Sequence, residues 1–263
     1  MNVILYIYIF LIGITFGSFF TLAIHRIPRN QDITHTRSYC PKCNHKLSFW
    51  DMIPMLSYIF LRGKCRYCKT KIAPKYFFIE LLTGLTFVLF AYSLRLQIFN
   101  LYFICGLLYI AGLFVISGID KEHHEVRLSV ILYMTIVQAI YIIYLYIIEQ
   151  SNVYRYVIYL VILAILILSD TIYFRKKLKN NYILENLILL NVMLMFTYEA
   201  CTILTVEFTL IVIAIKSFIE IIKNVKKKQE KIIPIAFYLC VTNIITLIIT
   251  NILCFYRWVL WID

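Results

Sequence analysis

Residues 128–148 read LSVILYMTIVQAIYIIYLYII and contain no charged side chain. An α-helix of this length spans about 30 Å, which is the thickness of the hydrocarbon core of a bilayer. By this criterion the chain contains further stretches of the same kind, eight in total. They are 3–24, 76–94, 98–119, 128–148, 153–169, 182–197, 200–222 and 232–253. We therefore predict an all-α polytopic membrane protein with about eight transmembrane helices.

The composition excludes most other classes of protein. Of the 263 residues, 62% are hydrophobic and only 15% are charged. Soluble domains have about 45–50% apolar and about 25% charged residues, so a soluble enzyme and a disordered chain are both excluded. The first apolar segment lacks the basic residues that open a cleavable signal peptide, and we expect it to remain as a membrane anchor.

The net charge of +12 is distributed unevenly along the chain. If the eight spans alternate in direction, loops 25–75, 120–127, 170–181 and 216–231 lie on one side and carry 23 of the 26 Lys and Arg residues. Because basic loops stay in the cytoplasm, we place both termini outside it and the protein in the cytoplasmic membrane. Anionic membrane lipid then accounts for the basic charge, and no nucleic-acid partner is expected.

Four cysteines lie in loop 25–75, the only long polar segment. They are arranged as two CxxC pairs, Cys40-Pro-Lys-Cys43 and Cys65-Arg-Tyr-Cys68. This spacing is typical of a structural zinc site with four thiolate ligands. Four free thiols are the alternative, and a disulfide is disfavoured in a reducing cytoplasm. A metal would stabilise a loop that has few large apolar residues of its own.

Two carboxylates are predicted at the cytoplasmic ends of spans. Asp120 ends the third span and Glu185 lies about one turn into the sixth. Ionisable groups in spans are costly and mark functional sites, and two carboxylates that share a proton can activate water for peptide hydrolysis. The alternatives are that Asp120 caps a following helix and that Glu185 makes a hydrogen bond at the membrane surface.

The sequence resembles the type 4 prepilin leader peptidases/N-methyltransferases, which are GxGD-type intramembrane aspartyl proteases. GSFF at 17–20 and HRIPR at 25–29 are similar to the opening motif of that family. Segment 40–84 follows the cysteine domain of the family almost position by position. IDKEH at 119–123 resembles the motif with the first catalytic aspartate, and Ile233-Pro234 resembles a motif near the end.

The resemblance implies cleavage of a basic leader from prepilin or pseudopilin precursors at the cytoplasmic membrane face. It also implies methylation of the new amino terminus with S-adenosylmethionine, although no residues for binding this methyl donor are identified by the sequence. On this basis the chain divides into a first transmembrane helix (1–24), a cytoplasmic cysteine domain (25–75) and a seven-helix membrane peptidase domain (76–263). Asp120 and Glu185 are the candidate catalytic residues.

The chain departs from the family pattern at the second catalytic aspartate. It contains no GxGD motif, and 65 residues after Asp120 it reads Tyr182-Ile183-Leu184-Glu185. One hypothesis is an active, divergent peptidase that uses Asp120 and Glu185. The other is a catalytically impaired member that binds pilins or assembly proteins. A small transporter is a weaker hypothesis, because the chain shows no inverted repeat.

Overall fold

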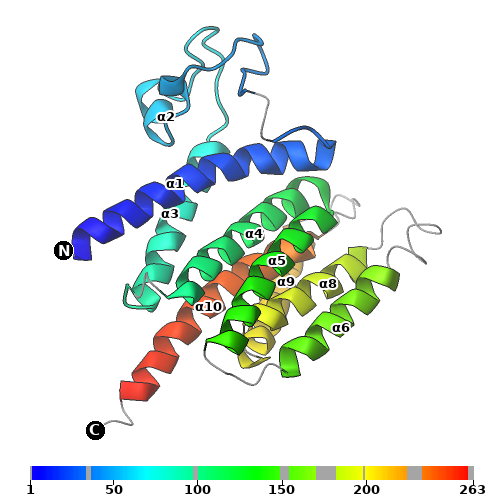
Figure 1. Ribbon diagram of the computed structural model, residues 1–263. Coiled ribbons are helices and arrows are strands. Elements are labelled where there is room, and N and C mark those ends of the chain that lie inside the picture. The colour runs from blue at the N-terminus through cyan, green and yellow to red at the C-terminus, as the bar shows by residue number, and fades with distance from the viewer. Residues whose placement is uncertain are drawn as a thin grey trace. The chain divides into compact units, whose positions relative to one another are not determined.

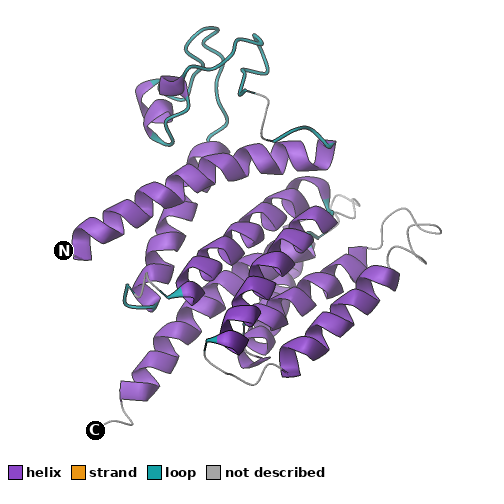
Figure 2. Cartoon of the chain, viewed as in Figure 1, coloured by secondary structure: helices purple, strands orange, loops and turns teal. Residues whose placement is uncertain are grey.

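The computed structural model describes residues 2–33, 37–96, 100–148, 154–169, 182–197, 199–223 and 233–259. In these ranges the chain is helical and contains two isolated bridges but no strand (Figure 2). The helices, labelled in Figure 1 where there is room, are α1 (Asn2–Arg26), η1 (Ile27–Arg29), η2 (Phe49–Asp51), α2 (Leu56–Phe60), α3 (Lys75–Ser93), α4 (Leu101–His123), α5 (Leu128–Ile147), α6 (Tyr154–Ser169), α8 (Tyr182–Phe196), α9 (Glu199–Lys223) and α10 (Ile235–Val259).

Each of the eight predicted spans coincides with one of the long helices. Six of them, α1, α3, α4, α5, α9 and α10, are long and apolar enough to cross a membrane. Helices α6 and α8 are also apolar but are shorter, at 16 and 15 residues. The predicted all-α, polytopic membrane fold is therefore confirmed. The basic segment 170–181, with Asp170, and most of segment 216–231 lie outside the described residues.

The chain forms two compact units, Met1–Gln97 and Ile98–Asp263. In the first unit α1 crosses α3 at glycines. A Cβ atom on Gly13 would lie 2.7 Å from the Gly84 Cα, and one on Gly17 would lie 2.7 Å from the Glu80 Cα. Gly13 and Gly17 form a GxxxG pair, which allows two membrane helices to approach closely. This crossing fixes the two ends of the cysteine loop, which leaves α1 and enters α3.

We expect Gly17→Val to destabilise the first unit by about 1–3 kcal/mol, because the new side chain meets backbone that cannot move aside. Thermal unfolding in detergent measures the change. Leu11→Val is the matched control, since Leu11 is exposed on α1 and should tolerate the same side chain. Equal unfolding temperatures for the two variants would contradict the close crossing.

In the second unit, α4 is the most deeply buried helix. Tyr109, Ile110, Leu113, Ile116 and Ile119 on α4 have no exposed surface. Helix α4 packs against α5 and α10, while α8 contacts α5, α6, α9 and α10. Asp120 is the last buried residue of α4, and the residues that end the helix, Lys121 to His123, are exposed.

Hydroxyl and amide side chains join α9 to α10. The hydroxyls of Thr205 and Thr246 lie 2.8 Å apart, those of Thr209 and Thr242 lie 2.6 Å apart, and Asn243 Nδ2 donates to Thr205 Oγ1 at 3.2 Å. The Tyr109 hydroxyl, on α4, donates to Asn243 Oδ1 at 2.8 Å and adds α4 to this group. Hydrogen bonds between membrane helices hold them together where lipid offers no hydrophobic driving force. The predicted spans α9 and α10 are thus paired by polar contacts as well as by apolar packing.

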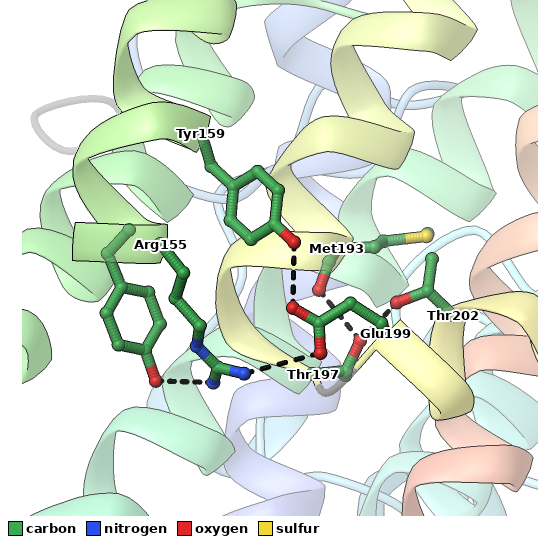
Figure 3. A network of polar contacts seen from close by, with 7 residues as sticks. Arg155, Tyr159, Met193, Thr197, Glu199 and Thr202 are labelled. Carbon is green, nitrogen blue, oxygen red and sulfur yellow. Dashed lines mark hydrogen bonds and ion pairs between the residues drawn. The ribbon is translucent and has the colours of Figure 1, made fainter. Parts of the chain in front are cut away.

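A second polar network joins α6 to the start of α9 (Figure 3). Glu199, the first residue of α9, accepts a hydrogen bond from the Tyr159 hydroxyl at 2.8 Å and pairs with Arg155 at 3.4 Å. The guanidinium of Arg155 also donates to the Tyr156 hydroxyl at 2.7 Å. Glu199, which interrupts the apolar sequence between the sixth and seventh spans, therefore marks the start of α9.

Candidate functional site

The four loop cysteines belong to two turns with the same backbone pattern. In the first turn, Cys40 N–H donates to the His45 carbonyl, and the Cys40 carbonyl accepts from Asn44 N–H. In the second, Cys65 N–H donates to the Thr70 carbonyl, and the Cys65 carbonyl accepts from Lys69 N–H. Each turn contains a residue with positive φ four positions after its first cysteine, Asn44 (φ 54°) and Lys69 (φ 59°). The two turns therefore share one backbone conformation, and each presents its two cysteine sulfurs in the same way.

The sulfurs of the two turns converge on one point. All four Sγ atoms lie within 4.8 Å of one another, and those of Cys40 and Cys68 are 3.8 Å apart. Zn–S bonds of about 2.3 Å in tetrahedral geometry place sulfurs about 3.8 Å from each other. The four thiols thus provide the donor set and the spacing that a tetrahedral metal ion requires.

Local hydrogen bonds favour the thiolate form of two of these cysteines. The Thr70 hydroxyl, 3.0 Å from Cys68 Sγ, and the Thr70 backbone lower the pKa of Cys68 to about 6. A hydrogen bond from the Cys43 backbone lowers the pKa of Cys40. The pKa of Cys43 is instead raised to about 11, because a hydrogen bond from the His45 backbone, which lowers it, is outweighed by desolvation and by the neighbouring thiols of Cys40 and Cys68. Because metals bind thiolates, an ion would have to displace the proton of Cys43 when it binds.

We expect the purified protein to contain about one zinc ion per chain, measured by mass spectrometry of the released metal. Cys43→Ser should release most of it, because one of four ligands is lost. Cys105→Ser is the control, since Cys105 is buried in α4 of the other unit. A full zinc content in Cys43→Ser, or none in the wild type, would exclude a four-cysteine zinc site.

Asp51 organises the loop around the cluster. Its carboxylate accepts hydrogen bonds from the Ser48 backbone (3.1 Å) and hydroxyl (2.7 Å), from Arg66 Nε (2.6 Å) and from the Tyr67 hydroxyl (3.3 Å). The side chain is only 3% exposed. Burial alone would raise the pKa of Asp51, but the bonds from Ser48 and Arg66 outweigh burial and lower the pKa. Asp51 therefore connects η2 to the second cysteine turn.

A carboxylate whose pKa is lowered by folding stabilises the fold above its unfolded pKa and loses this effect as the pH falls through its folded value. We expect Asp51→Asn to destabilise the cysteine loop by about 1–3 kcal/mol at neutral pH. The difference from the wild type should shrink below about pH 4, the ordinary value for aspartate. Limited proteolysis of the loop in detergent at several pH values measures this difference. A difference that is constant down to pH 3 would contradict the role of the charge.

The first unit also contains a cavity of about 830 Å³ between the second half of α1 and the cysteine loop. Its lining combines the carboxylates of Asp51 and Glu80, the basic Arg26, and the aromatic rings of Tyr39 and Tyr76. Glu80 is buried on α3, and its Oε2 accepts a hydrogen bond from the Met55 backbone at 2.6 Å. This bond joins α3 to the backbone of the cysteine loop. The cavity offers both charges and flat apolar surfaces to a small ligand.

In the second unit, Asp120 is completely buried at the end of α4. Its Oδ1 accepts a hydrogen bond from the Tyr182 hydroxyl and its Oδ2 accepts one from Phe237 N–H, both at 2.8 Å. The Tyr182 oxygen in turn accepts from Ile235 N–H at 2.6 Å and from Ala236 N–H at 3.3 Å. Asp120 and Tyr182 together satisfy the first three N–H groups of α10, which have no partner within the helix.

Glu185 lies at the same end of the second unit. It is in the first turn of α8, three residues after Tyr182, and therefore shares a helix face with that tyrosine. Its Oε2 accepts a hydrogen bond from Val126 N–H at 2.9 Å, in the turn between α4 and α5. The structure thus places both predicted carboxylates beside the α4–α5 turn and the start of α8.

Sequence reasoning identified the cysteines, Asp120 and Glu185 but missed three features. The GxxxG pair on α1 was a readable signal for the helix crossing. Tyr182 gave no signal, because its hydroxyl meets Asp120 only through the packing of α8 against α4 and α10. The bond between Glu80 and Met55 also joins residues that are far apart in the sequence.

Comparison with known proteins agrees with this geometry in the first unit. Residues 11–94 match the model of the bacterial peptidase A24 N-terminal domain, a range that includes the α1–α3 crossing and all four cysteines. This segment is therefore similar in sequence to that domain. Part of the chain is likewise similar in sequence to prepilin leader peptidases/N-methyltransferases, the family that the sequence motifs resemble.

Three of these relatives illustrate the extent of the similarity. The prepilin leader peptidase/N-methyltransferase of Myxococcus xanthus is 37% identical over 123 residues, which cover 47% of this chain and 36% of the relative. That of Klebsiella pneumoniae is 35% identical over 44% of this chain and 52% of its own. That of Vibrio cholerae is 44% identical over 29% of this chain and 34% of its own. The matches span about a third to a half of the relatives, and no solved structure matches the chain.

Proposed function

We propose that the protein is a prepilin peptidase of the cytoplasmic membrane, which cleaves the basic leader from prepilin or pseudopilin precursors. The observation that carries the proposal is the peptidase A24 N-terminal domain at residues 11–94. The buried carboxylate of Asp120 supports it, because a buried acid in a membrane helix is rarely retained without a role.

In the proposed reaction, one of the two carboxyl groups, Asp120 or Glu185, acts as the general base and the other acts as the general acid. One carboxylate accepts a proton from water while the water oxygen attacks the scissile carbonyl carbon. The other, protonated carboxyl group donates its proton to the leaving nitrogen as the C–N bond breaks. The products are the leader with a new carboxylate and the mature chain with a new amine. The pair needs only one shared proton at the start.

Access to Asp120 is the main requirement of this mechanism. The carboxylate has no exposed surface, and Tyr182 and the start of α10 occupy both of its oxygens. Water and substrate can reach Asp120 only if Tyr182 or α10 moves. We propose that Tyr182 is a positioning residue, which orients Asp120 in the resting state and yields when the precursor binds.

The cysteine domain has a supporting role in this proposal. Cys40, Cys43, Cys65 and Cys68 would hold a structural zinc ion, whose chemistry is to cross-link the loop. Asp51 and the two turns then keep the loop in one shape beside α1 and α3. With the loop on the cytoplasmic side and both termini outside, the protein contacts lipid and precursor proteins and no nucleic acid.

N-methylation of the new amino terminus is a second part of the proposal, suggested by the names of the relatives. The methyl donor S-adenosylmethionine carries an adenine ring, a carboxylate and cationic groups. The cavity of the first unit has counterparts for each of these: Tyr39 or Tyr76 for the ring, Arg26 for the carboxylate, and Glu80 or Asp51 for the cations. We therefore propose this cavity as the site for the methyl donor.

We expect the purified protein to shorten a cognate prepilin, and Asp120→Asn and Glu185→Gln each to lower the rate at least about 100-fold, because each removes an acid–base group. Mass spectrometry of the products measures cleavage and detects an added methyl group. Glu199→Gln is the matched control, because Glu199 lies at the start of α9 and pairs with Arg155. We expect this variant to cleave the prepilin at the wild-type rate.

The remaining outcomes separate the alternatives. Cleavage by Glu185→Gln at the wild-type rate would show that Asp120 works with a different partner. A wild-type protein that binds the precursor but never cleaves it would replace the peptidase with a non-catalytic pilin-binding subunit. Tyr182→Phe distinguishes positioning from chemistry, because it removes only the hydroxyl and should change the rate without abolishing cleavage.

A further inference from the structure

The short segment between η2 and α2 presents a large apolar surface. Phe49, Trp50, Leu56, Ile59 and Phe60 are 72%, 69%, 49%, 54% and 79% exposed, and we call these five side chains the aromatic face. Leu56, Ile59 and Phe60 are separated by three or four positions and so lie on one side of α2. The rings of Phe49 and Trp50 meet edge to face at 6.0 Å. Large exposed apolar patches mark binding surfaces.

Two contacts fix the position of α2 along α3. Met55 N–H, at the start of α2, donates to Glu80 Oε2 at 2.6 Å, and the rings of Tyr58 and Phe77 lie 5.5 Å apart. Glu80 is the sixth residue of α3, so it lies about 7–8 Å along that helix from its start. Because α3 is a membrane span, α2 lies beside the first two turns of the span and not above it.

The exposed surface of α3 continues in the same direction. Phe78 and Leu82, on the outer side of α3, are each 54% exposed. In a span of this kind such side chains face lipid. Phe78 meets the ring of Phe77 edge to face at 5.8 Å, and Phe77 contacts Tyr58 of α2, so α2 lies next to this exposed side of α3.

The polar residues around the aromatic face are strongly basic. Between residues 37 and 75 the chain has nine Lys and Arg residues and one acid, Asp51, which already pairs with Arg66. Anionic headgroups attract such clusters of basic residues near the membrane surface. Trp and Phe prefer the boundary between headgroups and acyl chains.

We propose that α2 and the preceding η2 turn lie in the headgroup–acyl boundary of the bilayer, with the aromatic face in lipid and the basic residues on anionic headgroups. The segment then holds the cysteine domain against the membrane beside α1 and α3. Lipid fits better than a partner protein as the occupant, because the bond between Met55 and Glu80 keeps α2 at the depth of a span. This inference does not depend on the proposed peptidase activity.

The test uses the full chain with Trp258→Phe and Trp261→Phe, so that Trp50 is the only tryptophan. The protein is reconstituted in vesicles of phosphatidylcholine and phosphatidylglycerol, with and without lipids brominated near the headgroup end of the chains. We expect the brominated lipids to quench Trp50 fluorescence at least twofold and aqueous iodide to quench it little. The reverse pattern would place the face in water and overturn the proposal.

Two further measurements test the parts of the proposal separately. Phe60→Ser, at the most exposed position of the aromatic face, should reduce the lipid quenching of Trp50 without unfolding the domain. Tyr39→Ser, outside the aromatic face, should leave the lipid quenching of Trp50 unchanged. Vesicles of phosphatidylcholine alone should give weaker quenching. Equal quenching in both lipid mixtures would overturn the role of anionic headgroups, and no effect of Phe60→Ser would overturn the role of the face.

Discussion

Backbone N–H groups at the start of a helix need a partner when lipid or packed protein excludes water, and Asp120 meets that need for α10, while three other acids bind N–H groups just before a helix. Asp120 bonds the start of α10 directly and through Tyr182. Glu80 bonds Met55 at the start of α2, Glu185 bonds Val126 just before α5, and Asp51 bonds Ser48 before η2. Negative charge is also stabilised there by the positive end of the helix dipole.

This constraint explains why the same residues suggest both structure and chemistry. A carboxylate that is costly to bury must be fully hydrogen-bonded, and so it determines where helices begin. The same desolvation makes it a candidate acid or base. For Asp120 the two roles compete, because the bonds that hold α10 occupy the oxygens that the proposed hydrolysis requires. An active enzyme must exchange one set of bonds for the other, and Tyr182 is the residue through which this exchange can take place.

The two units reach stability in different ways. In the first, glycines let α1 and α3 touch at the backbone, and the loop between them relies on paired cysteine turns, Asp51 and the contact with Glu80. In the second, α4 buries most of its side chains among apolar helices, while threonines and an asparagine join α9 to α10. The first unit depends on a few specific contacts, which is consistent with its close sequence match to a known domain.

The sequence by itself determined the membrane helices, the cysteine pairs and the resemblance of residues 11–94 to a known domain. Apolar length is a local property, and CxxC spacing forces two sulfurs toward one point within each turn. The sequence also placed Asp120 and Glu185 at the ends of spans, because their positions follow from the same length rule. Only the tertiary structure decided what those carboxylates bind, since Tyr182, Phe237 and Val126 reach them through helix packing. The position of α2 along α3 was likewise decided by tertiary contacts, of Met55 with Glu80 and of Tyr58 with Phe77, which no local pattern encodes.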